Sequence, residues 1–140
     1  MHRVPGYCIN DNHLERRNLW TDAIAQAVLV HHWEIFAKRY AGVSSRNLSF
    51  DLVNEPPSVG QYGMTRENHE QIMRRTIAAI RAITPTRAIT LDGLSGGHEA
   101  IPELAVVGVT HSGRAYGLEE LTNRALEADS SPGTIHELEF

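Results

Sequence analysis

A short apolar run between two helical patterns most constrains the fold of this chain. Residues 49–53, Ser-Phe-Asp-Leu-Val, have the composition of a buried strand. The strand must end before Pro56, because proline has no N–H to give to the ladder. Apolar residues recur at helical spacing on both sides, over residues 21–40 and 66–83. This alternation predicts a parallel sheet covered by helices, an α/β fold.

Two further strands and a short helix are expected downstream. Residues 88–91 and 106–110 are apolar runs of strand length, and residues 99–105 fit a short helix between them. A weaker helical pattern covers residues 119–128. We expect the first long helix to begin after Thr21 as N-cap and to bury Ile24, Ala27, Val28, Val30, Trp33, Phe36, Ala37 and Tyr40. We expect the second, which Pro85 ends, to bury Ile72, Met73, Thr76, Ile77, Ile80 and Ile83.

Composition excludes several classes of protein. The 140 residues carry a formal net charge of −4, so no basic surface for nucleic acid is expected. No apolar run approaches the roughly 20 residues that span a bilayer, so we expect no membrane partner either. The single cysteine, Cys8, has no partner for an internal disulfide.

Asn54 and Glu55 follow the central strand directly, and they are the first candidate site. A carboxylate held at the C-terminal end of a strand is how barrel enzymes present an acid or base to a substrate. In that interpretation Glu55 is a general acid/base and Asn54 is a hydrogen-bonding neighbour. The alternative is a capped strand end with a solvated glutamate.

The stretch Gly93-Leu94-Ser95-Gly96-Gly97 fits the nucleophile-elbow pattern G-x-S-x-G. Asp129 and His136 follow in the order Ser, Asp, His, so a serine hydrolase of the α/β-hydrolase type that uses Ser95 is one alternative function. A glycine-rich loop between a strand and a helix explains the same residues without catalysis.

Histidines do not form a metal-binding pattern. His98-Glu99 lacks the second histidine of a zincin motif, because Pro102 occupies that position. His31 and His32 are adjacent on a helix and point about 100° apart. We therefore expect no metal and no cofactor.

A second polar group follows the last predicted strand. His111, Arg114 and Tyr116 lie just past residues 106–110. Polar side chains in this position suit a substrate site, and a solvated polar loop is the alternative.

Several segments, taken in order, resemble glycoside hydrolase family 5, the cellulase family. These are residues 2–10 (His-Arg-Val-Pro-Gly-Tyr-Cys-Ile-Asn), 18–20, 48–57, 92–94 and 114–116. The Phe-Asp-Leu-x-Asn-Glu-Pro part of residues 48–57 is the most specific. The resemblance implies a (β/α)8 TIM barrel that hydrolyses the O-glycosidic bonds of β-linked polysaccharides with retention of configuration, as endo-β-glucanases do.

Site roles follow from the resemblance residue by residue. Glu55 matches the general acid/base, and Asn54 matches its hydrogen-bonding neighbour at the sugar. His2 matches a histidine after the third barrel strand, and Tyr116 matches a tyrosine after the sixth. The family has His-x-Tyr at the sixth strand, whereas this chain has Arg114 two residues before Tyr116 and His111 further upstream. Both His111 and Arg114 are thus candidates for that substrate-binding position.

Length departs from the family pattern. A barrel of this kind takes about 250 residues. We therefore expect residues 1–140 to form one incomplete barrel domain, with the resemblance strongest over 1–125 and an uncertain tail over 126–140. Glu137 and Glu139 are the last carboxylate side chains of the chain and do not match the nucleophile. We expect the chain to be a truncated part of a longer protein and to be inactive alone.

A non-catalytic sugar-binding remnant is a further alternative. Tyr7, Trp20 and Tyr116 would then offer aromatic surface to a sugar, whereas Trp33 and Tyr40 are expected in the core of their helix.

Overall fold

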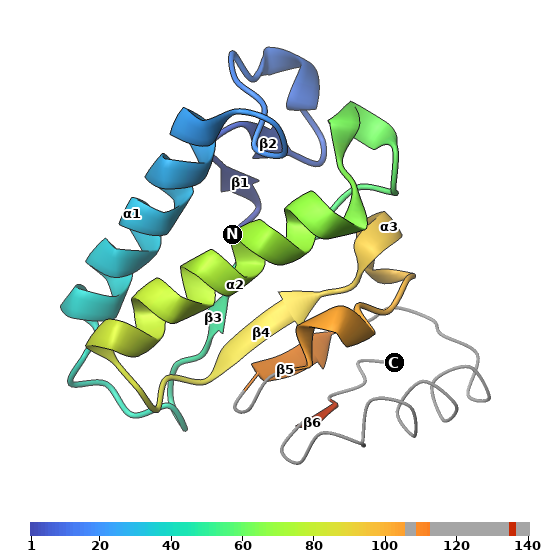
Figure 1. The fold of residues 1–140 in the computed structure, drawn as a ribbon. Coiled ribbons are helices and arrows are strands. Elements are labelled where there is room, and N and C mark those ends of the chain that lie inside the picture. The colour runs from blue at the N-terminus through green and yellow to red at the C-terminus, as the bar shows by residue number, and fades with distance from the viewer. Residues whose placement is uncertain (106–108, 113–134, 137–140) are drawn as a thin grey trace.

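A parallel sheet covered by helices forms the body of the chain (Figure 1). The computed structural model describes residues 1–105 and 109–112 and the backbone of residues 135–136. Strands pair in chain order, each parallel to the next: β3 (Phe50–Asp51), β4 (Ile89–Asp92), β5 (Val109–Ser112) and β6 (Ile135–His136). The α/β class is the one the sequence predicts, and the four described strands do not close into a barrel.

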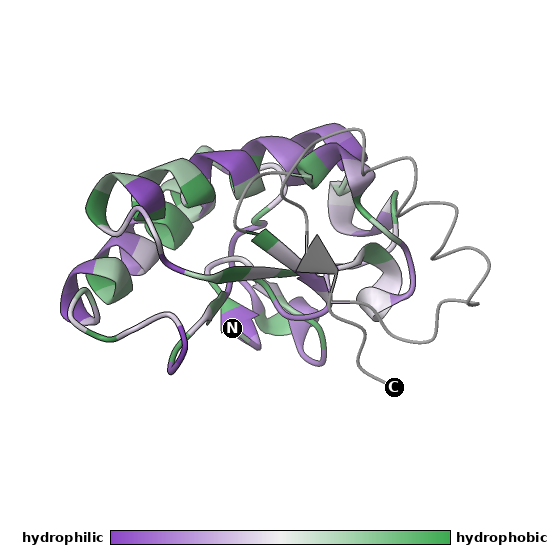
Figure 2. Cartoon of the chain, turned by 90° about the horizontal axis from the view of Figure 1, so that it is seen from below, coloured by the Kyte–Doolittle hydropathy of each residue, from purple (hydrophilic) through white to green (hydrophobic). Residues whose placement is uncertain are grey.

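Two long helices, α1 (Ala23–Arg39) and α2 (Arg66–Ile83), pack against each other beside the sheet. Figure 2 shows both on one side of the strands. The shorter helical elements are α3 (Leu94–Gly97) and the 3-10 turns η1 (Asn12–Leu14), η2 (Gln61–Gly63) and η3 (Pro102–Leu104). Of the helices described, none is both long and apolar enough to cross a membrane.

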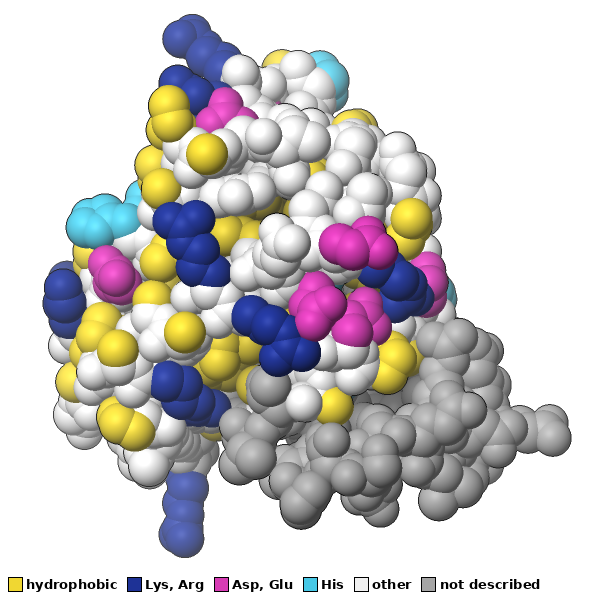
Figure 3. Space-filling model, in the orientation of Figure 1, with side chains coloured by type: hydrophobic (Ala, Val, Ile, Leu, Met, Phe, Trp, Pro, Cys, Tyr) yellow, Lys and Arg dark blue, Asp and Glu magenta, His cyan; other side chains and the backbone are white. Residues whose placement is uncertain are grey.

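Helix α1 differs from its prediction at its start and on its buried face. Asp22, not Thr21, is the N-cap, because its carboxylate accepts the backbone N–H groups of Ile24 and Ala25. The buried face is a narrow stripe with a spacing of four: Ala25, Leu29, Trp33 and Ala37. Ile24, Ala27 and Val28 are exposed, so their predicted burial is wrong. Hydrophobic side chains accordingly appear on the α1 side of the surface in Figure 3.

Helix α2 confirms its prediction, with the same bounds of Arg66–Ile83. Thr65 and Asn68 form a capping box at its start. The predicted stripe faces the core, and His69 joins it there.

Strand bounds shift by a few residues. The β3 ladder covers Phe50–Asp51 rather than residues 49–53, although Leu52 still donates its N–H to the carbonyl of Thr90 at 3.3 Å. Strand β5 reaches Ser112, and residues 106–108 lie outside the described part. The predicted helix over residues 99–105 is only the turn η3, and that over residues 119–128 is not described.

The first residues form a hairpin. Strands β1 (Arg3–Val4) and β2 (Tyr7–Cys8) pair antiparallel around Pro5-Gly6. Gly6 has φ +80°, and a Cβ there would lie 2.6 Å from the backbone nitrogen of Leu19, so only glycine fits. The chain before the hairpin lies against the end of β3, where the carbonyl of Met1 accepts the N–H of Asn54 at 3.0 Å.

Arg87 organises the opposite end of the sheet. Its buried guanidinium donates to the carbonyls of Leu48, Tyr40 and Val43 at 2.7, 2.7 and 2.8 Å. It also lies 5.0 Å from the ring centroid of Phe50. The loop between α1 and β3 is thus tied to the segment that precedes β4.

Candidate functional site

Glu55 lies directly past the C-terminal end of β3, with Asn54 before it. Its backbone is in the left-handed region, with φ 49°. Few non-glycine residues adopt this conformation, and those that do cluster at functional sites. The half-buried glutamate is therefore held in a defined, uncommon geometry at the end of the strand.

Both backbone groups of Glu55 are fixed by side chains. Its N–H donates to the Oδ2 carboxylate oxygen of Asp92 at 2.9 Å. Its carbonyl accepts the hydroxyl of Tyr7 at 2.6 Å. Burial, more than the neighbouring Tyr62 and Glu55, raises the pKa of Tyr7, so the hydroxyl stays protonated as a donor. Asp92 ends the adjacent strand β4 and Tyr7 lies on β2, so two elements position the same residue.

Pro56 and Pro57 are held by the loop after β4. Prolines have no N–H, so the carbonyl is their only backbone polar group. The carbonyl of Pro56 accepts the N–H of Gly96 at 3.0 Å, and that of Pro57 accepts the N–H of Ser95 at 3.3 Å. Ser95 adopts φ 57° in this turn. The glycine-rich stretch thus supports the segment that carries Glu55.

The serine hydrolase alternative gains nothing from this geometry. The hydroxyl of Ser95 pairs with the Oε2 oxygen of Glu99 at 3.4 Å, whereas a nucleophilic serine needs a histidine base. Asp129 lies outside the described residues. His136 is described only as backbone in β6, next to β5.

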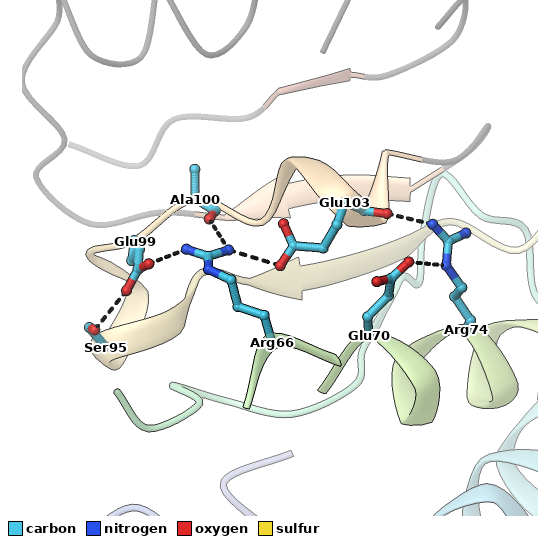
Figure 4. Close-up of polar contacts among 7 residues, drawn as sticks. All are labelled: Arg66, Glu70, Arg74, Ser95, Glu99, Ala100 and Glu103. Carbon is cyan, nitrogen blue, oxygen red and sulfur yellow. Dashed lines mark hydrogen bonds and ion pairs between the residues drawn. The ribbon is translucent and has the colours of Figure 1, made fainter. Parts of the chain in front are cut away.

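An ionic network fixes the support loop to helix α2 (Figure 4). The guanidinium of Arg66 bridges Glu99 and Glu103, with 2.8 Å to the latter, and also donates to the carbonyl of Ala100 at 3.3 Å. Arg74 adds a contact to the carbonyl of Glu103. The start of α2 is therefore held against the segment after β4.

Asn54 and His2 both lie near the C-terminal end of β3. The Nδ2 of Asn54 is buried and has no hydrogen-bond partner within the described part of the chain. Burial raises the pKa of Asp51 at this strand end and Asp92 adds to the increase, whereas the N-terminal amine and the exposed His2 oppose it. His2, Asn54 and Glu55 are thus brought to one edge of the sheet.

Other predicted site residues are only partly covered. His111 is half-buried on β5, paired with Leu91 of β4. Arg114 and Tyr116 lie outside the described residues, as do Glu137 and Glu139.

The prediction that Tyr7 and Trp20 offer aromatic surface to a sugar is wrong. Tyr7 and Trp20 are each 1% exposed and pack edge-on, with ring centroids 5.4 Å apart. They fill the core under the hairpin, as Trp33 does under α1, which confirms the core prediction for Trp33.

Sequence reasoning missed the residues that support Glu55. Asp92 carried a signal, because it directly follows the strand predicted over residues 88–91, just as Asn54 and Glu55 follow the strand before them. The contacts of Tyr7, Ser95 and Gly96 with residues 55–57 carried none, since they join positions far apart in the chain. No set of three or more His, Cys, Asp and Glu side chains that would suit a metal ion occurs in the described ranges.

Parallel strands covered by helices, with a glutamate fixed where a strand ends, define part of a (β/α) barrel of the glycosidase type. The chain belongs to the cellulase family, glycosyl hydrolase family 5, whose sequence model matches residues 3–126. The predicted family resemblance is therefore confirmed.

Solved structures agree with this family. A glycoside hydrolase crystal structure is 62% identical, with a TM-score of 0.80 over 88% of this chain and 37% of its own. An endoglucanase is 25% identical, with a TM-score of 0.56 over 67% of this chain and 30% of its own. Thermotoga maritima Cel5A, solved with cellobiose, shares the fold at 20% identity, with a TM-score of 0.57 over 75% and 34%. No curated protein matches the chain.

Proposed function

We propose that Glu55 is the general acid/base of a retaining glycoside hydrolase that cleaves β-linked polysaccharides. The chain spans 37% of the length of the 62% identical glycoside hydrolase, so the activity proposed is that of the whole barrel. The observation that carries the proposal is the position of Glu55 at the end of β3, with its N–H and carbonyl fixed by Asp92 and Tyr7.

The chemistry needs one carboxyl group in two protonation states. As an acid it gives a proton to the oxygen of the departing sugar, and as a base it then takes a proton from the water that releases the glycosyl-enzyme intermediate. A second carboxylate about 5–5.5 Å away acts as the nucleophile. A proton donor must lie within a few tenths of an ångström of its productive position beside the glycosidic oxygen. A fixed backbone at Glu55 leaves only the side-chain torsions of that residue to vary.

Substrate contacts are proposed for the polar residues around Glu55. The Nδ2 of Asn54 is buried and has no hydrogen-bond partner among the described residues, which supports a hydrogen bond to a sugar hydroxyl, because a buried donor without an acceptor is costly. His2, His111, Arg114 and Tyr116 are proposed to bind further hydroxyls. The cellobiose complex of Thermotoga maritima Cel5A supports a β-linked glucan as substrate for this chain.

The test uses a graft. In the 62% identical hydrolase, the stretch that aligns with this chain is replaced by it, giving a protein that we call the grafted hydrolase. Glu55→Gln should lower hydrolysis of a soluble β-1,4-glucan by roughly 10²–10⁴-fold. The first step with a dinitrophenyl cellobioside should suffer far less, because that leaving group departs without a proton.

Glu67→Gln is the matched control, because Glu67 is an exposed carboxylate on α2. It should leave both rates unchanged. Glucan hydrolysis that survives Glu55→Gln would rule out the assignment of Glu55.

A further inference from the structure

An exposed tyrosine lies in a strained turn after the segment that carries Glu55. Tyr62 is 47% exposed and has φ 53°, a conformation that is an outlier for a bulky side chain. It sits in η2 between Gly60 and Gly63, both of which also have positive φ. Burial alone does not account for this strain, since nearly half of the residue is exposed, and such strain often marks a ligand contact.

The turn is held in place from several directions. Asn18 donates its Nδ2 to the carbonyl of Tyr62 at 2.7 Å, and Asn68 donates to the carbonyl of Gly63 at 3.0 Å. The N–H of Gly60 reaches the carbonyl of Met64 at 2.8 Å. The structure therefore fixes the backbone that presents the ring, which lowers the entropy cost of binding a ligand against it.

The ring of Tyr62 lies close to the groups that position Glu55. Its centroid is 6.4 Å from that of Tyr7, with the planes inclined by 58°. The hydroxyl of Tyr7 in turn bonds the carbonyl of Glu55 at 2.6 Å. Tyr62 and Glu55 thus both contact Tyr7, Tyr62 through its ring and Glu55 through its backbone carbonyl.

We propose that the ring of Tyr62 is a stacking platform for the sugar unit on the leaving-group side of the scissile bond. The inference rests on the proposed function, because Glu55 protonates the oxygen of that sugar. One face of a β-linked glucose ring carries only C–H groups, and an aromatic ring offers it apolar area with little entropy to lose. Tyr7 and Trp20 are buried and cannot stack on a sugar. Val59 is exposed on the same loop as Tyr62 but has no aromatic ring.

Binding of cellopentaose to the 140-residue chain, measured by isothermal titration calorimetry, tests the platform. Tyr62→Asn removes the ring with a residue that tolerates positive φ, and Tyr62→Gly does so with no strain. Both should weaken binding about tenfold. Tyr62→Phe keeps the ring and should bind within about twofold of the parent, as should Val59→Ala on the same loop.

Melting temperatures are measured for every variant. Of Tyr62→Asn and Tyr62→Gly, the one whose melting temperature matches that of the parent chain is used to compare binding. Full-strength binding by that variant would overturn the proposal. So would failure of the parent chain to bind cellopentaose, or equal losses in Tyr62→Phe or Val59→Ala. Hydrolysis by the grafted hydrolase with Glu55→Gln is an independent readout, so either idea can fail without the other.

Discussion

The carboxylate of Asp92 accepts a hydrogen bond of 2.9 Å from the backbone N–H of Glu55. Asp92 is the last residue of β4, and Glu55 follows the neighbouring strand β3. The end of β4 thus fixes the position of Glu55, which follows β3. The contact also explains how Glu55 keeps a φ of 49°, since its N–H is paired in that conformation.

Removing this acceptor should displace the proposed acid/base. In the grafted hydrolase, Asp92→Ala is expected to lower kcat on β-glucan about tenfold or more, because small misplacements of a catalytic group are costly. Asp92→Asn keeps an oxygen that can accept the N–H, so it should retain more activity than Asp92→Ala. Equal activity of Asp92→Ala and the parent would show that Glu55 needs no support from β4.

The hydroxyl of Tyr7 is the second support. Tyr7→Phe keeps the ring against Trp20 but leaves the carbonyl of Glu55 without its 2.6 Å donor. We expect the free energy of unfolding of the chain to fall by about 1 kcal/mol in urea titrations. Tyr40→Phe, on the half-buried end of α1, is the control and should change it by less than about 0.5 kcal/mol. Equal effects of the two substitutions would argue against a specific role for the Tyr7 hydroxyl.

His69 should make stability depend on pH. Burial lowers its pKa from 6.5 to about 4, and the ring lies against Trp20. The unfolded chain therefore binds a proton as pH falls below 6.5 while the folded chain does not, and stability is lost over that range. Between pH 7 and pH 5 the loss attributable to His69 should be about 2 kcal/mol.

Urea titrations at both pH values measure this loss in the parent and in His69→Gln. The glutamine variant should show a smaller drop in unfolding free energy between pH 7 and pH 5. Identical drops in the two proteins would mean that His69 is not the group responsible.

Arg87 should be among the most costly positions to change outside the site. Arg87→Met removes donors from the carbonyls of Tyr40, Val43 and Leu48, all within 2.8 Å of the guanidinium. We expect a loss of about 3 kcal/mol or more in unfolding free energy. Arg75→Met, at an exposed position of α2, should cost less than about 0.5 kcal/mol. A loss at Arg87 no larger than at Arg75 would contradict the bonding described.

Local patterns predicted the two long helices well. Helix α2 has its apolar stripe and Pro85 after its end, and its bounds match those predicted. The start of α1 was shifted by one residue, because Thr21 and Asp22 are both good caps and only geometry selects Asp22. The exposed Ile24 and Val28 share the apolar character of buried residues, and composition cannot separate them.

Long-range contacts were beyond sequence reasoning. Ser95 and its glycines match a catalytic motif, yet the backbone N–H groups of Ser95 and Gly96 bind the carbonyls of Pro57 and Pro56. Tyr62 gave no signal, since its left-handed conformation depends on bonds from Asn18 and from the turn itself. Pairings between distant positions leave no spacing pattern in a single chain.

Rescue of Glu55→Ala by azide in the grafted hydrolase is the most direct test of the account. Without its base, the variant should form the glycosyl-enzyme intermediate from dinitrophenyl cellobioside and then stall. Azide needs no proton removed, so adding it should restore turnover and yield β-cellobiosyl azide. Turnover that does not respond to azide, or that matches the parent without it, would contradict the role of Glu55 as acid/base.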